Sequence, residues 1–412
     1  MIETYLKPAP VKKKYFTPGV IVLIVIAVNG LIFLAGRFLF GIGAVTNLNN
    51  QYPWGLWIGV DVATGVALAA GGFTSAALGH VMHREQIHAI LRPALLTAML
   101  GYTFVAIGVF VDIGRWYYIW HPIIMWNGNS ALFEVGICVM MYMTVLYIEF
   151  LPVITERFIG RVNLKGFLSI LNNPLDRLLR FLDKWLGLTM FIFIILGVVL
   201  STLHQSSLGT LMVIAGHKMH HLWQTPILPL LFLLSAISVG FPMIIFESIL
   251  AAKSFGYKAE MDVLSMLAKY VAPLLGIYLA FKIGDMVIRG TYIFLTEVNV
   301  KSVMFFIEVV AGIIIPLRMF LSPPVLKSKK LLFTASALVV FGVLLNRINN
   351  FIVAYNPPYK FSTYFPSFGE ISVTVGLASL LILFYRFIAI NFPVISIPNK
   401  DFVPSTKYTV RG

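Results

Sequence analysis

The chain alternates between long apolar stretches and short polar segments. A membrane-spanning helix needs about 20 predominantly apolar residues, because the hydrocarbon core of a bilayer is about 30 Å thick. This length criterion predicts ten spanning helices and hence an all-α polytopic membrane protein. The helices are expected near residues 18–40, 54–81, 93–116, 130–154, 185–204, 227–252, 265–287, 299–320, 331–354 and 368–391.

Residues 157–184, between the fourth and fifth predicted helices, carry a different pattern. Apolar residues recur there every three or four positions, which is typical of an amphipathic helix lying at the membrane interface. They are Phe167, Ile170, Leu171, Leu175, Leu178, Leu179 and Leu182. We expect a single integral membrane domain over residues 1–412, with an N-terminal segment at 1–17, membrane helices within 18–391 and a tail at 392–412.

Composition and charge support this interpretation. Hydrophobic residues make up 59% of the sequence and charged residues 12%, whereas soluble domains are about 25% charged. The net charge of +14 would suggest nucleic-acid binding in a soluble protein. Here, however, the basic residues are concentrated in every second loop between the predicted spans. They are concentrated in the N-terminus, the even-numbered loops and the C-terminus, whereas the odd-numbered loops offer Lys218, Arg289, Lys301 and Lys360. The positive-inside rule therefore predicts that both termini are cytoplasmic.

Polar side chains within the apolar stretches are the best guide to function. A charged group at the bilayer centre costs about 2.5–3.5 kcal/mol on insertion scales, so such groups are usually paired or functional. Glu149 and Glu247 are expected near the cytoplasmic ends of their helices and Glu308 about halfway. Near the extracytoplasmic ends we expect Asp61, Asp112, Arg115, Asn129, Glu134, His204, Gln205, Ser206 and Asp285. The sequence thus predicts a polar cluster at the extracytoplasmic side of helices two to five.

Two aspartates in this cluster have an informative local sequence. Trp54 suits the membrane interface, and Asp61 lies about two turns further along, roughly 10 Å deeper. Asp112 and Arg115 are three positions apart, share a helix face and can form an ion pair. That pair either only cancels its own insertion cost or presents a charge to a polar ligand, and the sequence leaves both possibilities open.

The fourth predicted helix begins with Asn129, Ser130 and, one turn later, Glu134. Asn129 or Ser130 can cap the helix N-terminus through a side-chain oxygen. A partly buried carboxylate titrates closer to neutral pH than a solvated one, which favours a proton-carrying role for Glu134.

His204, Gln205 and Ser206 are adjacent hydrogen-bonding residues at the predicted end of the fifth helix. A quinone needs a donor at each carbonyl oxygen, and histidine can also exchange a proton near neutral pH; a histidine at a helix end can equally be an interfacial residue. At the opposite side, Glu149 and Glu247 either pair with loop lysines or form a proton path with Glu134.

Cysteine and histidine placement argues against metal cofactors. The single cysteine, Cys138, cannot form an internal disulfide or ligate an iron–sulfur cluster alone, and the absence of a Cys-x-x-Cys-His motif excludes covalent haem. A b-type haem needs two histidines at matching depth. The histidines are expected at the inner side (His80, His83, His88) and the outer side (His121, His204, His217, His220, His221). We predict no haem, no iron–sulfur cluster and no metal site in this chain.

Several short motifs together resemble the NrfD/PsrC-like family of integral membrane subunits, in particular its HybB-type branch, the membrane subunits of periplasmic nickel–iron hydrogenases. The resemblance covers most of the chain. The matching segments are Phe40–Gly43, Tyr52–Gly55, Arg92–Leu96, Asp112–Arg115, Asn129–Glu134, His204–Ser207 and Tyr364–Pro366.

This resemblance implies a cofactor-free subunit of the bacterial inner membrane, with two four-helix bundles at its centre and peripheral helices around them. It implies electron exchange between menaquinone and a periplasmic ferredoxin-like iron–sulfur subunit that is attached to catalytic hydrogenase subunits. The quinone site would be near the periplasmic face. Glu134 and Glu247 match family positions considered for proton transfer.

We therefore expect a quinone-reactive subunit of a respiratory oxidoreductase, with Glu134, His204 and Asp112 as the reacting groups. Glu134, Glu149 and Glu247 would form the proton path. The quinone would be bound by Trp54, Asp61, Arg115, Asn129, Gln205 and Ser206. The same role in a molybdopterin or multihaem complex remains open, as do a passive membrane anchor and a secondary transporter centred on Glu308 with broken helices at the midplane.

Overall fold

The computed structural model describes residues 6–76, 88–360 and 362–398. Ten helices in these ranges are long and apolar enough to cross a membrane, which confirms the predicted number. In chain order the spans are α2 (Pro18–Phe40), η2–α3–α4 (Trp57–Thr64, Gly65–Leu68, Ala70–Ala76), α5 (His88–Asp112), α7 (Ala131–Phe158), α8 (Asn172–Ala215), α9 (Leu228–Phe255), α10 (Met261–Ile288), α11–η9–α12 (Val300–Val309, Val310–Ile314, Ile315–Phe320), α14–η10 (Lys329–Ile348, Asn349–Val353) and α15 (Phe368–Asn391).

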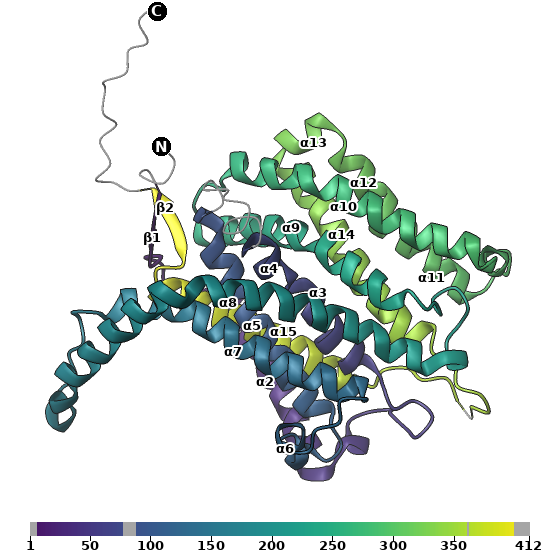
Figure 1. Ribbon diagram of the computed structural model, residues 1–412, viewed down its shortest axis with the longest axis horizontal. Coiled ribbons are helices and arrows are strands. Elements are labelled where there is room, and N and C mark those ends of the chain that lie inside the picture. Colours follow the sequence, from purple (N-terminus) through teal and green to yellow (C-terminus); the bar gives the residue numbers. More distant parts are fainter. Residues whose placement is uncertain (1–5, 77–87, 361, 399–412) are drawn as a thin grey trace, which may run out of the picture.

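The spans form two bundles, which are seen as two groups of ribbons in Figure 1. The first bundle contains η2–α3–α4, α5, α7 and α8, and the second contains α9, α10, α11–η9–α12 and α14–η10. Contacts of α9 with α4 and α8 join them. The remaining helices, α2 and α15, pack on each other, and α15 also contacts α5. This is the predicted arrangement of two four-helix bundles plus peripheral helices.

Short elements connect the spans. They are η1 (Ile42–Ala44), η5 (Trp116–Tyr118), α6 (His121–Ile124), η6 (Gly166–Leu171), η7 (Gly216–Lys218), η8 (Thr291–Leu295) and α13 (Pro323–Lys327). Strand β1 (Leu6–Ala9) pairs antiparallel with β2 (Ile395–Pro398), next to the first and last spans. Both ends of the described chain therefore lie on the same face, which we call the terminal face.

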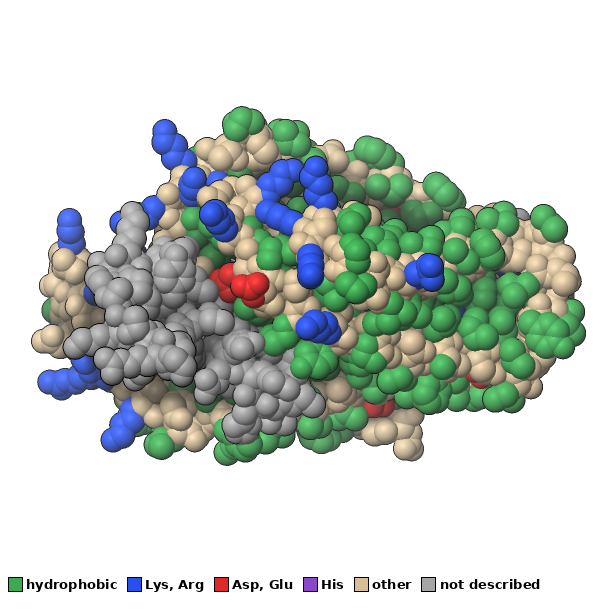
Figure 2. All heavy atoms as spheres, turned by 90° about the horizontal axis from the view of Figure 1, so that it is seen from above, with side chains coloured by type: hydrophobic (Ala, Val, Ile, Leu, Met, Phe, Trp, Pro, Cys, Tyr) green, Lys and Arg blue, Asp and Glu red, His purple; other side chains and the backbone are tan. Residues whose placement is uncertain are grey.

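The opposite face, which we call the odd-loop face, is formed by residues 41–56, 113–130, 216–227, 289–299, 354–360 and 362–367. Figure 2 shows Lys and Arg side chains at the left and centre of the view, toward the side on which β1 and β2 lie in Figure 1, whereas hydrophobic side chains cover most of the right. The distribution of charge agrees with the sequence count, and a cytoplasmic position for the terminal face remains a prediction.

The prediction for the fifth span was wrong at both ends. Helix α8 is one helix of 44 residues that unites the amphipathic segment with the span and continues past residue 204 to Ala215. His204 therefore lies 11 residues before the helix end, roughly 16 Å along its axis, and not at the membrane boundary. This polar run resembles a helix end in sequence, but Gln205 and Ser207 are buried against other helices, whereas Ser206 is half-buried and bonds its own helix.

The ends of other helices differ less from the predicted ones. Helix α5 ends at Asp112, before the predicted residue 116. Residues 77–81 of the second predicted span lie outside the described residues, as do His80 and His83.

Three spans contain π-helical segments, in which the hydrogen-bond spacing is widened by one residue. The segment η2 contains Asp61, and η10 begins at Asn349. The segment η9 begins two residues after Glu308. Such segments are rare in helices and are frequent at functional sites. Each of the three coincides with a polar residue inside an apolar span.

Close contact between α2 and α15 depends on two glycines. A Cβ at Gly30 would lie 2.7 Å from the Ser372 carbonyl oxygen and 2.8 Å from the Gly376 Cα. Both obstacles are backbone atoms, so a side chain at Gly30 would force the helices apart.

We expect Gly30→Ala to destabilise the protein by about 1–3 kcal/mol, the usual cost of overpacking. Gly19→Ala, in the first turn of the same helix with nothing within 4 Å of its added Cβ, should leave stability unchanged or slightly raised. Thermal unfolding in detergent measures both, and equal melting temperatures for the two variants would contradict this packing.

Candidate functional site

A line of polar side chains follows the contact between α7 and α8 in the first bundle. On α7, Glu134, Tyr142 and Glu149 recur at intervals that keep them near one helix face. We call this line the polar seam; it comprises Glu134, Ser207, His204, Tyr102, Tyr142, Ser201 and Glu149. From Glu134 to Glu149 it extends about 22 Å along α7, at 1.5 Å per residue.

His204 is at the centre of the seam and has no exposed surface. Its Nδ1 lies 3.2 Å from the hydroxyl of Tyr102 on α5, and the Tyr102 ring packs edge-on against Tyr142 at 4.4 Å. Its Nε2 has no protein partner among the described residues, and neither has the Ser201 hydroxyl oxygen one turn away. The centre of the seam can therefore hold a further hydrogen-bonding group, such as water.

Gln205 lies beside His204 and fixes the backbone of the neighbouring span. Its Nε2 donates to the Val66 carbonyl at 2.7 Å, while its Oε1 is buried without a partner in the described part of the chain. Ser206, in contrast, bonds only within its own helix, to the Leu203 carbonyl at 2.8 Å.

Glu134 forms the end of the seam closest to the odd-loop face. It lies in the first turn of α7, is exposed, and accepts a 2.6 Å hydrogen bond from Ser207 of α8. Ser130, rather than Asn129, caps the helix by accepting from the Phe133 amide. Leu132 and Leu203 nearby are exposed by 62% and 45%, so Glu134 lies where the apolar outer surface of the bundle meets the seam.

Glu149 forms the other end. It is half-buried, and a Cβ on Gly197 of α8 would come within 2.9 Å of its Oε1. The third acid of the predicted path, Glu247, lies at a different interface, facing Thr97 of α5 and Tyr385 of α15. The structure thus joins Glu134 and Glu149 through one helix contact and places Glu247 apart from them.

Asp61 and Asp112 belong to a separate cluster beneath the odd-loop face, between η2, α5, α2 and α15. Asp61 accepts a 2.8 Å hydrogen bond from Thr374, and its Cβ packs against Gly108, one turn before Asp112 on the same face of α5. Asp112 Oδ1 is buried without a partner among the described residues. The predicted meeting of Asp112 with Glu134 and His204 is therefore not seen.

The predicted ion pair between Asp112 and Arg115 is also not formed among the described residues, because α5 ends at Asp112 and Arg115 is exposed beyond it. The basic residue at this position is instead Arg37 of α2, which is 1% exposed. It donates to the carbonyl oxygens of Val111 and Ile113, both at 2.5 Å. Arg37 thereby caps the end of α5 with a charged donor from another helix.

Glu370, in the first turn of α15, holds the odd loops over this cluster. Its buried carboxylate accepts from the amides of Asn47 and Ser367 at 3.0 and 2.8 Å and from the Tyr364 hydroxyl. Burial, reinforced by this carboxylate, raises the pKa of Tyr364 well above its usual value, so the phenol stays protonated as a donor. Trp54 is half-buried against Phe351 and Tyr355, and Asn129 is exposed.

The sequence interpretation missed Tyr102, Tyr142, Arg37 and Glu370. It also missed Lys282 and Arg347, buried cations of the second bundle that are within reach of Glu308. The insertion-cost argument that selected the aspartates applies equally to Arg37, Lys282 and Arg347. The tyrosines gave no such signal, because a tyrosine in an apolar stretch is ordinary.

The donor set around His204 does not fit a haem held between two histidines. Tyrosines of α5 and α7 occupy the positions facing the imidazole, and the other described histidine side chains lie on the odd-loop face. Among the described residues there is also no group of three or more His, Cys, Asp or Glu side chains that could hold a metal ion.

Comparison with known proteins places the chain in a family. A model of the family described as polysulphide reductase, NrfD matches residues 44–356. The chain belongs to the NrfD family. The matched region begins after α2 and ends before α15, so the family's common core consists of the two bundles.

Individual relatives align along nearly the whole length. The chain is 35% identical to a protein of Nitratidesulfovibrio vulgaris, over 94% of this chain and 97% of the relative. It is 30% identical to the probable Ni/Fe-hydrogenase 2 b-type cytochrome subunit of Escherichia coli, over 94% and 95%. It is 27% identical to the integral membrane subunit of menaquinone reductase of N. vulgaris, over 86% of each chain. NrfD-family relatives are thus membrane subunits of respiratory oxidoreductases, and this chain is a multi-pass protein of the inner-membrane type.

Arg37 provides a direct test of the site architecture. Arg37→Met should lower the free energy of unfolding by about 2–3 kcal/mol, because two buried carbonyl oxygens lose a charged donor. Arg115→Met should have no measurable effect, since Arg115 is exposed. Thermal unfolding of the purified variants measures the difference, and equal stability of the two would show that Arg37 does not hold the end of α5.

Proposed function

We propose that this subunit passes electrons between menaquinone and a periplasmic iron–sulfur subunit, and that the polar seam exchanges the protons that accompany them. The observation that carries this proposal is the contact between Glu134 and Ser207. It links a carboxylate at the lipid-exposed surface to a buried histidine–tyrosine cluster.

The quinone head group would bind at the Glu134 end of the seam. A quinone enters from the lipid, so its site must open to the apolar surface of the bundle, as the surroundings of Glu134 do. Glu134 and the Ser207 hydroxyl would orient one carbonyl oxygen by hydrogen bonding. When bound, the quinone would supply the two-electron chemistry, and the residues of this chain would supply donors and protons.

Protons would travel along the seam between Glu134 and Glu149. His204, Tyr102 and Tyr142 are donors and acceptors at intermediate depth, and the free Nε2 of His204 and the Ser201 hydroxyl can take up bridging water. If the terminal face is cytoplasmic, as the basic residues predict, a proton entering at Glu149 would reach the quinone from the cytoplasm. Quinone reduction would then contribute to the proton-motive force.

The partner would dock on the odd-loop face, the predicted periplasmic side. The 113–130 loop presents exposed aromatic side chains there, including Trp120 and Trp126. The similarity to a hydrogenase subunit supports a nickel–iron hydrogenase as the donor complex. The similarity to the menaquinone reductase subunit supports menaquinone as the acceptor.

Glu134→Gln should reduce menaquinone turnover by about 100-fold, within the usual contribution of a general acid or base. Electron transfer from the donor to an artificial dye should stay at the wild-type rate, because the dye takes electrons before they reach this chain. The assay uses the purified complex with both acceptors.

Glu297→Gln is the matched control, since Glu297 is an exposed glutamate on the same face but in the second bundle. It should behave as wild type with both acceptors. Wild-type menaquinone turnover by Glu134→Gln would remove Glu134 from the mechanism.

Tyr142→Phe should slow menaquinone turnover about tenfold or more and increase its solvent deuterium isotope effect, because one proton-carrying hydroxyl of the seam is lost. Tyr147→Phe, at an exposed tyrosine of the same helix whose hydroxyl bonds Thr103 of α5 at 2.9 Å outside the seam, should change neither quantity. An unchanged isotope effect in Tyr142→Phe would show that protons bypass the seam.

A further inference from the structure

A buried ion pair lies at the centre of the second bundle, away from the seam. Lys282 of α10 approaches Glu308 of α11 with Nζ 2.5 Å from Oε1, and the two side chains are 7% and 1% exposed. Asn346 donates to the same oxygen at 2.8 Å. Trp223 and Asn349 donate to Oε2 at 3.0 and 2.7 Å. The carboxylate is thus held by four donors from three parts of the chain: α10, the 216–227 segment and the α14–η10 span.

A second buried cation makes this cluster electrostatically unbalanced. Arg347 of α14 has no exposed surface and lies 3.7 Å over the Phe232 ring. It donates to Asn346, to Ser235 at 2.9 Å and to the Phe232 carbonyl at 3.2 Å, all neutral groups. Within the described residues the cluster therefore contains two cations and one anion. Protonation of Glu308 would leave both cations without a buried counter-charge.

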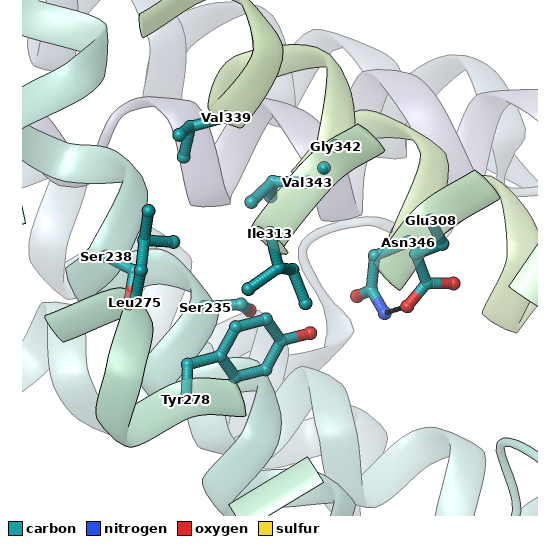
Figure 3. Close-up of a pocket in the computed structure, with 11 residues that line it drawn as sticks. Ser235, Ser238, Leu275, Tyr278, Glu308, Ile313, Val339, Gly342, Val343 and Asn346 are labelled. Carbon is teal, nitrogen blue, oxygen red and sulfur yellow. Dashed lines mark hydrogen bonds between the residues drawn. The ribbon is translucent and has the colours of Figure 1, made fainter. Parts of the chain in front are cut away.

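Two small cavities lie on either side of the pair. The first is lined by Glu308, Asn346, Tyr278, Ser235 and Ser238 among others, and Figure 3 shows these side chains around one space. The second is lined by Lys282, Asn346, Trp223, Thr225, Asp285 and Arg289 among others. The first contacts Glu308 and not Lys282, and the second contacts Lys282 and not Glu308.

The size of the cavities determines what they can hold. Each has a volume of about 10 Å³, close to the minimum for a single water molecule, and too small for a quinone or another organic substrate. Asn349 Oδ1, Asn350 Oδ1 and Arg347 Nε are buried without a partner among the described residues. Of these three residues, Asn350 lines the second cavity, so a water molecule there can bind its open oxygen and carry a proton.

The second cavity leads toward the odd-loop face. Asp285 and Arg289 are one and two turns beyond Lys282 on α10, and they form an ion pair at 2.6 Å that is 10% and 22% exposed. Thr225 donates to the same aspartate at 2.8 Å. A chain of polar groups thus leads from the surface to the buried lysine.

We propose that the Lys282–Glu308 pair is a proton-translocating site in the second bundle, distinct from the seam. A proton from the first cavity binds to the Glu308 carboxylate and makes it a neutral acid. Lys282, which has lost its Glu308 counter-charge, releases a proton into the second cavity toward Asp285. The Glu308 proton then moves to the Lys282 amine, which restores the original pair. One proton has moved toward the odd-loop face, and no group has changed its charge overall.

The other charged and titratable groups near the pair come from α10 and its C-terminal end and from α14. They are Tyr278, Asp285 and Arg289 of α10 and Arg347 of α14. The widened turns of η9 and η10 begin beside Glu308 and at Asn349, which gives the backbone around the carboxylate an irregular geometry.

Lys282→Arg separates a proton-translocating role from a structural one. Arginine retains the positive charge and the ion pair, but it does not release its proton in proteins. The purified complex is reconstituted into liposomes with a trapped pH-sensitive dye, and protons moved per electron are measured during menaquinone reduction. The wild type should move more protons than quinone reduction alone requires. Lys282→Arg should lose this excess, while its turnover with an uncoupler stays within about twofold of wild type.

Lys301→Arg, a lysine-to-arginine change at the odd-loop start of α11, is the matched control and should retain the excess. Lys282→Met with Glu308→Gln removes both charges, which avoids leaving one buried charge unpaired; it should also lose the excess, and it replaces Lys282→Arg if that variant does not assemble. The proposal would be overturned if the wild type moved no more protons per electron than quinone reduction alone requires. It would also be overturned if the Lys282 variants kept the wild-type excess of protons per electron.

If the wild-type complex reduces no menaquinone, the proposed function fails separately. The pair is then tested by proton flux under an imposed potassium diffusion potential. At least threefold lower flux in the Lys282 variants supports the proposal, and equal flux overturns it.

Discussion

The structure depends on one constraint: a polar side chain inside an apolar helix must find its partner on another helix. Water is absent from the hydrocarbon core, so an unpartnered polar group there is costly. Four contacts between helices meet this requirement. They join Arg37 to the end of α5, Gln205 to Val66, Thr374 to Asp61, and Lys282 to Glu308. These contacts fix which helix faces meet, and they concentrate the chemistry of the chain between helices.

These buried polar side chains form three clusters, which differ in how far each is open to the surface of the protein. The polar seam reaches the apolar outer surface at Glu134, where a lipid-soluble carrier can approach. The cluster of Asp61 and Asp112 lies beneath loops that Glu370 holds in place. The pair of Lys282 and Glu308 is enclosed and adjoins spaces of water size. This difference in access is why we propose the first cluster as the quinone site and the third as a site for protons alone.

The sequence was sufficient for the number of spans, because that number depends on apolar runs of sufficient length. The two bundles were expected only from the family resemblance, and run length alone does not give them. It also selected Glu134 and His204, which the structure places on α7 and α8 of the first bundle; their roles stay a prediction. It could not predict the end of α8, since His204, Gln205 and Ser206 look the same in sequence whether they face headgroups or another helix. Nor could it predict that Asp112 contacts the α2–α15 side of the bundle, because that depends on packing between distant segments.

Three buried basic residues also escaped the sequence interpretation. Arg37, Lys282 and Arg347 interrupt apolar stretches just as Asp61 does, but Arg115 was the only basic residue selected within a span. Tyr102 and Tyr142 became significant only when the structure placed them against His204.

The most direct test of the central claim is an experimental structure of the complex with a bound menaquinone analogue. The account predicts that the analogue's head group lies within hydrogen-bonding distance of Glu134 or Ser207, with its tail along the exposed surface of α7 and α8. A head group bound against Asp61 and Asp112, with the seam closed to it, would contradict the account.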